Sequence, residues 1–335
     1  MSAPLRPTGE EFRDDHRRAS LHGLPLDQLA ELTRLEPARS CLALAQTLAI
    51  TAVAIGVACL WWTPWVILPA ALIIATQQHA LFVLAHDAAH YRLFQSRALN
   101  DAAGRSLGSI TGISMCAYRV VHRLHHNHLY GPQDPDIALH GGYPRGKRYL
   151  LRKLATDLAG LTAWKTYNYF FFGAPAANSA TQAAQRPLDD TSPTLRRAAL
   201  RDRWGILAFQ IAAPVIVLAL FGWAGLVKYL VLWVLPAVTV LQAILRVRAI
   251  CEHGAPRDHV SPLTAARTTL AAPLLRFALF PHHVNYHIEH HLFPSVPHYN
   301  LPRLHEALSV RGILDGAEVR TFSEAWRRVY ADAAT

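Results

Sequence analysis

Four long apolar stretches dominate the hydrophobic pattern of the chain. At about 1.5 Å of rise per residue, a helix of roughly 20 residues crosses a hydrocarbon core about 30 Å thick, so each stretch can span a bilayer. The last stretch ends near Arg246, whose long side chain can reach the interface. The transmembrane helices predicted from this pattern comprise residues 41–62, 65–85, 204–227 and 229–250.

Short connections join these stretches in pairs. Only Thr63 and Pro64 separate the first two, and Lys228 separates the last two. Connections this short permit only tight helical hairpins, whereas the segment between the two pairs is long and polar. We therefore predict an all-α integral membrane protein with four transmembrane helices in two hairpins. Residues 86–203 and 251–335 are expected to form a helical cap.

The positions of Lys and Arg indicate which side of the membrane the cap occupies. Of the 33 Lys and Arg residues, 32 fall in residues 1–40, 92–203 and 246–335, and Lys228 alone lies at a turn on the opposite side. The positive-inside rule predicts this asymmetry for two hairpins whose ends are cytoplasmic. The first 30 residues have no apolar signal-peptide core, so residues 1–40 should form a cytoplasmic N-terminal segment. We expect a multi-pass protein forming a single domain, 1–335, with both termini and the cap in the cytoplasm.

The composition narrows the class of protein further. A net charge of +10 can indicate a nucleic-acid partner, but 52% of the residues are hydrophobic and the mean hydropathy is positive. These values argue against a soluble nucleic-acid binder, and the membrane topology explains the basic excess. The four cysteines show no CxxC pairing, so neither a disulfide framework nor a zinc knuckle is supported.

Three short windows concentrate the histidines. The first, HDAAH at 86–90, begins where the second predicted transmembrane helix ends, and its two histidines are four residues apart. The other two, HRLHH at 122–126 and HIEHH at 287–291, share a spacing that places three imidazoles on one face of a helix. All three windows lie on the cytoplasmic side of the predicted topology. Their eight histidines are His86, His90, His122, His125, His126, His287, His290 and His291.

Eight imidazoles indicate a metal centre. Imidazole binds iron, zinc, copper and nickel, so the ligand type alone does not choose the metal. Eight donors exceed the needs of one tetrahedral zinc ion, but they supply about four donors to each of two metals and leave positions open for O2 or water. Two irons fit this number best, so we predict a di-iron site held by the cytoplasmic cap.

Polar side chains beside the windows are candidates for orienting the metal ligands. A carboxylate that accepts a hydrogen bond from the second ring nitrogen fixes an imidazole in place, although a plain solvated carboxylate is an equal alternative. Asp134 and Asp136 could hold an arginine or a ligand histidine, and His79, about 10 Å deeper in the membrane than His86, is expected to make a buried polar contact. The candidates that adjoin the windows or the end of the fourth helix are Asp87, Glu252, Asn285 and Glu289.

As a set, HDAAH, HRLHH and NYHIEHHLFP resemble the three histidine boxes of the membrane fatty acid desaturase and hydroxylase superfamily, over roughly residues 40–305. In that family the fourth span usually ends with a further metal-binding histidine. His253, in RAICEHG, occupies the matching place, so the resemblance implies a ninth ligand. The three-residue interval in the first box is similar to that of acyl-lipid desaturases, particularly bacterial ones, which implies a bacterial inner membrane as the location.

The resemblance implies an O2-dependent fatty acyl lipid desaturase that introduces a carbon–carbon double bond at a histidine-ligated di-iron centre. The cofactors would be two iron ions, with O2 as co-substrate, and the substrate a membrane lipid or other acyl compound. The sequence contains no HPGG-like haem-binding segment and no four-cysteine cluster. An external electron donor of the ferredoxin or cytochrome type is therefore expected, and no nucleic acid.

Other functions stay open at this point. Histidine boxes do not distinguish desaturation from hydroxylation or ketolation of a lipid, a carotenoid or a sterol. A non-enzymatic metal-binding or transport protein would place several ionisable residues along a path through the membrane, but His79 alone lies within a predicted span. A peripheral scaffold would need a polar stripe along the apolar helices, which these stretches lack. The sequence does not identify the substrate, its carrier or the position of the double bond.

Overall fold

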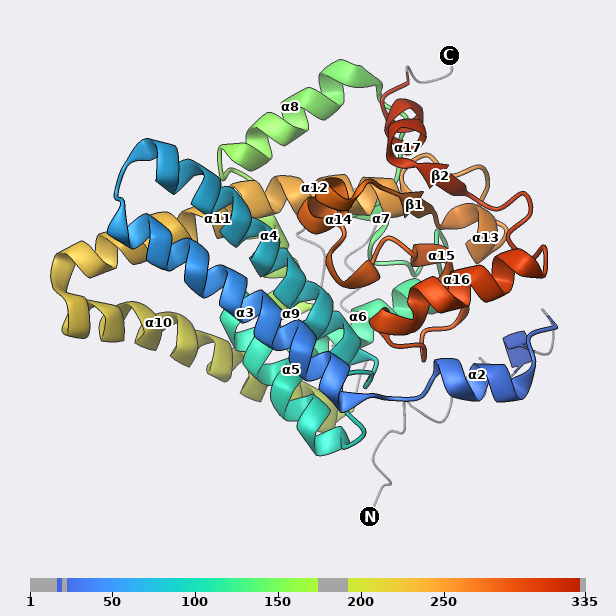
Figure 1. The fold of residues 1–335 in the computed structure, drawn as a ribbon, viewed down its shortest axis with the longest axis horizontal. Helices are drawn as coiled ribbons and strands as arrows, with labels where there is room; N and C mark the ends of the chain where they lie inside the picture. The colour runs from blue at the N-terminus through green and yellow to red at the C-terminus, as the bar shows by residue number, and fades with distance from the viewer. Residues whose placement is uncertain (1–16, 20–22, 174–191, 332–335) are drawn as a thin grey trace.

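The computed structural model describes residues 17–19, 23–173 and 192–331 (Figure 1). Parts of the predicted N-terminal segment (1–16 and 20–22) and of the predicted cap (174–191 and 332–335) lie outside this range. The described chain is mostly helical, as expected. It also contains two short strands, β1 (Thr268–Leu270) and β2 (Val319–Thr321), which pair in parallel, so a purely α-helical fold is a slight simplification.

The first hairpin consists of α3 (Pro37–Leu60) and α4 (Pro64–Ala89). Each helix begins with a proline, which suits this position because the first helical N–H has no intrahelical partner. Both helices continue beyond the predicted spans 41–62 and 65–85 at the end that faces the cap. The second half of α4 is buried on all sides, packed among α3, α5 and α12. Helix α4 therefore lies at the centre of the helical packing.

The second hairpin bends at a different residue from the one predicted. It contains α10 (Pro193–Tyr229), a π-helical turn η1 (Leu230–Val234), α11 (Leu235–Val238) and α12 (Val240–His253). Gly222 has φ 63° and ψ −164°, a conformation essentially restricted to glycine. The chain reverses there, at the left of Figure 1, on the same side as the turn between α3 and α4. The predicted division at Lys228 is thus displaced by six residues from the break observed at Gly222.

Lys228 lies within the second arm of the second hairpin, where its side chain contacts residues of the first hairpin. Its ammonium group donates a hydrogen bond to the carbonyl oxygen of Cys59 over 3.0 Å. It also lies 5.4 Å from the centre of the Trp62 ring, in a cation–π contact. The charge therefore lies near the end of the molecule that carries both hairpin turns, although it does not form the turn.

Three apolar helical segments are long enough to cross a membrane: Leu26–Leu60, Pro64–Ala89 and Pro193–His253. The last contains 61 residues, which as one straight helix would be about 90 Å long, so the break at Gly222 divides it into two arms. Large apolar side chains on these arms face outward, with Ile211 64%, Leu220 70% and Trp223 73% exposed. Apolar exposure on this scale fits a bilayer rather than water. The chain is a membrane protein of mostly helical fold.

The cap is built from shorter elements at the end opposite the hairpin turns (Figure 1). Helices α5 and α6 begin at Ser96 and Ser114, whose hydroxyls accept hydrogen bonds from the first-turn N–H groups. A core formed by α2, α15 and α16 closes the far side of the cap. The elements between the hairpins are α5 (Arg97–Thr111), α6 (Met115–Asn127), α7 (Ile137–His140), α8 (Gly146–Leu158) and α9 (Ala163–Phe172); the others are α2 (Leu26–Leu32), α13 (Pro262–Ala265), α14 (Pro273–Leu279), η2 (Pro281–His283), α15 (His287–Leu292), η3 (His298–Asn300), α16 (Leu301–Val310) and α17 (Phe322–Val329).

Candidate metal centre

Four helices bring nine histidines together where the hairpins meet the cap. Helix α4 carries the first pair at its end, and α6 and α15 each carry three histidines at the expected i, i+3 and i+4 positions. Helix α12 ends at His253, which joins the others. These are the nine residues singled out from the sequence. They form two groups, His86, His90, His122, His126 and His290, the five-histidine cluster, and His125, His253, His287 and His291, the four-histidine cluster.

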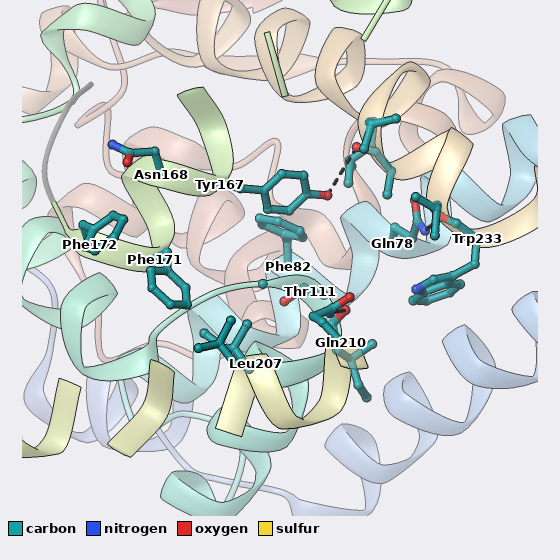
Figure 2. A pocket seen from close by; sticks show the side chains of 17 residues that line it. Gln78, Phe82, Thr111, Tyr167, Asn168, Phe171, Phe172, Leu207, Gln210 and Trp233 are labelled. Carbon is teal, nitrogen blue, oxygen red and sulfur yellow. Dashed lines mark hydrogen bonds between the residues drawn. The ribbon is translucent and has the colours of Figure 1, made fainter. Parts of the chain in front are cut away.

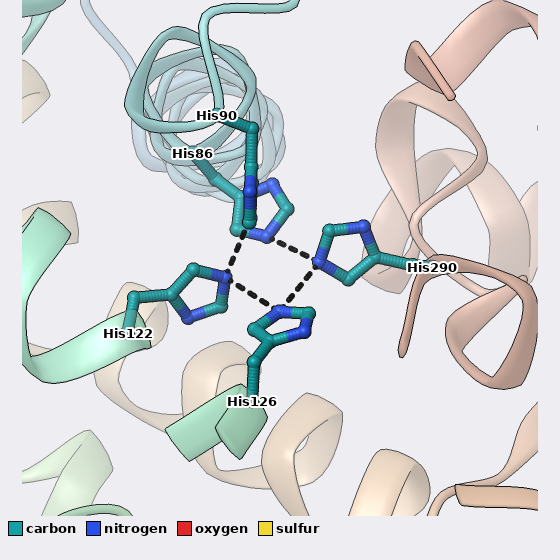
Figure 3. Close-up of side chains that lie close together, drawn as sticks. All are labelled: His86, His90, His122, His126 and His290. Carbon is teal, nitrogen blue, oxygen red and sulfur yellow. Dashed lines mark hydrogen bonds between the residues drawn. The ribbon is translucent and has the colours of Figure 1, made fainter. Parts of the chain in front are cut away.

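The five-histidine cluster is a set of Nε2 atoms that face one another (Figure 3). The Nε2 atom of His122 lies 2.9 Å from that of His90 and 3.1 Å from that of His126. The Nε2 atom of His290 lies 3.0 Å from those of both His126 and His86. Nitrogen donors from three separate helices thus converge on one small volume, so the cluster can hold a metal ion.

The four-histidine cluster repeats this arrangement beside the first. The Nε2 atom of His253 lies 2.7 Å from that of His287 and 3.2 Å from that of His125. His291 completes the group, 3.1 Å from His287. The rings of His126 and His291 stack with their centres 4.3 Å apart, so the two clusters adjoin. The residues present therefore fit two neighbouring metal ions with nitrogen ligands.

Burial keeps most of these imidazoles in the form that binds metal. In His122, His126, His290 and His291, burial and then the neighbouring histidines hold the pKa well below its usual range. An imidazole with a lowered pKa is neutral at pH 7 and has a free lone pair. Neutral imidazoles in these positions could bind a metal ion without first losing a proton.

Two aspartates contact ligand histidines through the ring nitrogen that faces away from the clusters. Asp134, buried at 1% exposure, places Oδ1 2.9 Å from Nδ1 of His125. Although burial lowers the pKa of His125, Asp136 and Asp134 outweigh it and raise the pKa overall. Asp87 places Oδ1 3.4 Å from Nδ1 of His86. Its other oxygen, Oδ2, is 2.6 Å from Nδ1 of His298 and anchors the carboxylate.

The other three candidates beside the windows lie differently. Glu252 accepts a hydrogen bond from Arg248 over 2.7 Å, and its Oε1 is 3.7 Å from Nδ1 of His287, too far for a direct hydrogen bond. The structure does not bring Glu289 to a ligand imidazole; its oxygens accept from Thr268 and from His305, each at 2.5 Å. The amide of Asn285 donates to the carbonyl oxygen of Thr269 over 3.2 Å and so joins the turn between η2 and α15 to β1.

Two features near the clusters were not predicted from the sequence. His140, 1% exposed, lies against the four-histidine cluster, with its ring centre 4.7 Å from that of His253 and its Nε2 3.8 Å from Asp134. No spacing rule identifies it, because 13 residues separate it from the second window. The ring of Tyr118 stacks on His122, with the centres 5.1 Å apart. His79 is fully buried, as expected, and belongs to neither cluster, but the expected polar contact is not found: within the described residues neither of its ring nitrogens has a hydrogen-bond partner.

An apolar pocket of about 380 Å³ lies one helical turn from the first window (Figure 2). Phe82, four residues before His86 on α4, lines it. The rings of Phe82 and Phe170 meet at 5.3 Å, and those of Phe170 and Tyr118 at 5.7 Å. Because Tyr118 in turn stacks on a histidine, these aromatic rings form a partition between the pocket and the five-histidine cluster.

The comparison with protein families identifies the scaffold that carries these clusters. The family model for fatty acid desaturases matches residues 60–321, which include all nine clustered histidines. The chain belongs to the fatty acid desaturase family. It is therefore a member of the membrane desaturase and hydroxylase superfamily, an oxidoreductase class, and its apolar helices and histidine clusters agree with the family assignment.

The individual relatives of this chain share only low sequence identity with it. The chain is 26% identical to the dihydrorhizobitoxine desaturase of Bradyrhizobium elkanii, covering 78% of the chain and 72% of the relative. It is 26% identical to the sn-1 acyl-lipid omega-3 desaturase (ferredoxin) of a Synechocystis strain, over 71% of the chain and 66% of the relative. It is also 26% identical to the β-carotene ketolase of a Paracoccus strain, over 67% and 72%. Against one plant omega-3 desaturase the chain spans only 54% of the relative's length.

Proposed function

We propose that this protein is an O2-dependent fatty acyl lipid desaturase that introduces a carbon–carbon double bond at a di-iron centre held by the nine clustered histidines. The observation that carries the proposal is the convergence of these histidines into two adjoining clusters of nitrogen donors. Five donors in one cluster and four in the other suit two metal ions. Bound irons would supply the redox chemistry that activates O2 and removes hydrogen from an unactivated methylene.

The protein's own residues would position the ligands and the substrate. Asp134 would orient the imidazole of His125 through its contact with Nδ1 at 2.9 Å, and Asp87 would orient that of His86 through a longer contact of 3.4 Å. Tyr118, Phe170 and Phe82 form an apolar wall that keeps bulk water away from the five-histidine cluster. Electrons would come from a separate protein of the ferredoxin or cytochrome type; the printed name of the Synechocystis relative specifies ferredoxin.

The same proposal includes the arrangement in the membrane. The four hairpin arms, 37–60, 64–89, 193–221 and 223–253, would each cross the bilayer, and the two turns between them would face the opposite side. The other residues would form one cytoplasmic cap within a single domain, 1–335, with α9 at the membrane interface. The two hairpin turns lie together at one end of the molecule, and helices α6 and α15, which carry six of the clustered histidines, lie toward the other (Figure 1). A bacterial inner membrane, with both termini and the metal centre on its cytoplasmic face, accommodates this arrangement.

Lipid mass spectrometry of cells that express the chain tests the reaction. Wild-type protein should produce acyl chains that lack two hydrogen atoms, and His290→Ala should abolish this change. His290 belongs to the five-histidine cluster, whereas the partly buried His128 belongs to neither, so His128→Ala is the matched control and should retain activity. The purified wild type should contain about two irons per chain, and His290→Ala fewer. Unchanged lipids in wild-type cells, or full activity in His290→Ala, would contradict the proposal.

Hydroxylation or ketolation is the second candidate, favoured by the similarity to the β-carotene ketolase. It would use the same histidines and differ only in the fate of the substrate. Acyl chains, carotenoids and sterols must therefore all be analysed in the same extracts. A gain of oxygen, or a change confined to carotenoids or sterols, would select this candidate over desaturation.

A further inference from the structure

The apolar pocket has the chemistry of a hydrocarbon-binding site. It is lined by aromatic and aliphatic side chains from α4, α5, α9, α10, η1, α11 and α12 (Figure 2). Three of its polar side chains donate hydrogen bonds to the backbone: Tyr167 donates to the carbonyl oxygen of Ala237 over 3.3 Å, and Gln210 to that of Ser109 over 2.9 Å. Gln78 likewise donates to the carbonyl of Trp233 over 2.8 Å. Such a lining suits an apolar chain better than a polar ligand.

The pocket lies at a depth that places it inside the bilayer. Leu207 on one arm of the second hairpin is 15 residues from Gly222, and Trp233 on the other arm is 11 residues from it. At about 1.5 Å per residue, these positions are roughly 22 Å and 17 Å from the hairpin turn. Both distances fall within a hydrocarbon core about 30 Å thick. Lipid chains therefore surround this part of the molecule.

The pocket opens sideways between α9 and α10. Phe172 on α9 and Leu207 on α10 line it and are also 48% and 41% exposed. The lining residues on its inner side are closed off, with Phe82 6% and Leu241 1% exposed. The opening thus faces the lipid, and the closed inner side ends at the aromatic partition before the histidines. We call the opening the α9–α10 portal and the buried residues Phe82 and Leu241 the pocket floor.

Positive charge borders the portal. Arg203, one turn before Leu207, donates hydrogen bonds to the carbonyl oxygens of Phe171 and Phe172 over 2.9 and 3.3 Å, which fixes its guanidinium at the rim. Arg197 and Arg201 precede it on α10 and are exposed. Basic residues that directly precede a membrane-embedded segment attract the phosphate groups of lipid headgroups. A phospholipid at the rim can place its phosphate among these arginines while its acyl chain lies at the portal.

The geometry points to a pocket that takes the acyl chain of an intact phospholipid sideways from the bilayer through the α9–α10 portal. The substrate's carrier is then a membrane lipid rather than a water-soluble thioester, which would approach from the cytoplasm. Entry of the chain rests on the pocket and on the proposed arrangement in the membrane, whereas its later modification rests on the proposed desaturase function.

Photo-crosslinking in nanodiscs tests the entry of the chain. The probe is phosphatidylglycerol with a diazirine in one acyl chain, and mass spectrometry of peptides locates the label. Bulk lipid reaches exposed positions but not the floor, so label on Phe82 or Leu241 requires a chain inside the pocket. Leu207→Trp should block the portal and lower floor labelling several-fold. Ile216→Trp is the control, because Ile216 is 54% exposed on the same helix and does not line the pocket.

The possible outcomes distinguish entry of the chain through the portal from the proposed reaction. Equal floor labelling in wild type and Leu207→Trp, or none in wild type, would overturn the portal. Floor labelling by the same chain on acyl carrier protein, but not on phospholipid, would also overturn it. Lipid analysis of the same membranes reports on the reaction: floor labelling without modified lipid would support the portal and contradict the desaturase function, and modified lipid without floor labelling would do the reverse.

Discussion

At the scale of single residues, the candidate metal centre depends on which ring nitrogen of each histidine faces the cluster and which faces a neighbouring residue. Cluster histidines face one another through Nε2, which leaves Nδ1 available for a partner behind the ring. His125 has the shortest such contact, to the carboxylate of Asp134. A carboxylate in this position fixes the ring and strengthens the nitrogen on the other side as a ligand. The four-histidine cluster should therefore depend on a residue outside it.

Asp134→Asn should weaken the four-histidine cluster while preserving side-chain volume. The amide lacks the negative charge that supports His125, so metal affinity or activity should fall about 10- to 100-fold. Iron per chain after dialysis against a chelator and turnover at saturating iron are the measurements. Asp315→Asn, an exposed loop substitution, serves as the control. Unchanged iron retention in Asp134→Asn would show that His125 needs no such support.

Phe82 is the residue whose size should set how the pocket meets the five-histidine cluster. Phe82→Leu removes part of the aromatic partition, so an acyl chain should lie differently relative to the histidines and the position of its modification should shift. Product analysis by mass spectrometry after double-bond derivatisation locates the modified carbon. Ile110→Ala changes another lining residue, on α5, and should leave that position unchanged. An identical product from Phe82→Leu would mean that the partition does not position the chain.

The clustering of the histidines was the part of the candidate site most accessible from the sequence. Spacing of three and four residues places side chains on one helical face whatever the rest of the chain does, so the HxxHH windows predicted clusters that the structure contains. His253 came only from family resemblance, because one histidine at a helix end has no spacing signal. For Asp134 the sequence left an arginine and a histidine open as partners, and the structure selects His125. That contact and the position of His140 depend on how the irregular chain between α6 and α7 folds back, which no local pattern encodes.

At the scale of elements, apolar periodicity predicted the hairpins but misplaced one turn. Lys228 was taken as the turn because it is the charged residue that interrupts the apolar pattern, and a charge inside a bilayer would be costly. The structure offsets that cost with a carbonyl and an aromatic ring from the first hairpin, contacts between distant segments that the sequence alone cannot reveal. The turn instead falls at Gly222, where backbone conformation rather than charge decides.

Substitution of Gly222 should destabilise the second hairpin. A side chain at φ 63° and ψ −164° is strained even though space for a Cβ is open, so Gly222→Ala should cost about 1–3 kcal/mol. Gly56→Ala is the matched control, because Gly56 lies inside α3 with equally open surroundings and no positive φ. Thermal unfolding in detergent, followed by size-exclusion chromatography, compares the two. Equal melting temperatures would show that the turn tolerates a side chain.

At the scale of the whole molecule, a buried ion pair connects the C-terminal part of the cap to the metal centre. Arg267, 1% exposed, donates to the carbonyl oxygens of Cys251 and Ala255 over 3.2 and 3.1 Å, on either side of His253. Its guanidinium pairs with Glu318, 3.3 Å away and fully buried, directly before β2. The end of α12, and with it the clustered His253, is thereby tied to chain 65 residues later.

Glu318→Ala should therefore loosen the four-histidine cluster from a distance. Removing one partner leaves the charge of Arg267 buried without its carboxylate, which typically costs about 3–5 kcal/mol. The melting temperature and iron retention should both fall.

Replacing both residues, in Arg267→Met with Glu318→Ala, removes the stranded charge and should recover stability but not iron retention, because the two carbonyls beside His253 lose their donor. Glu306→Ala, on an exposed face of α16, should change neither measurement. Recovery of both properties in the double variant would mean that the ion pair stabilises the fold without positioning His253.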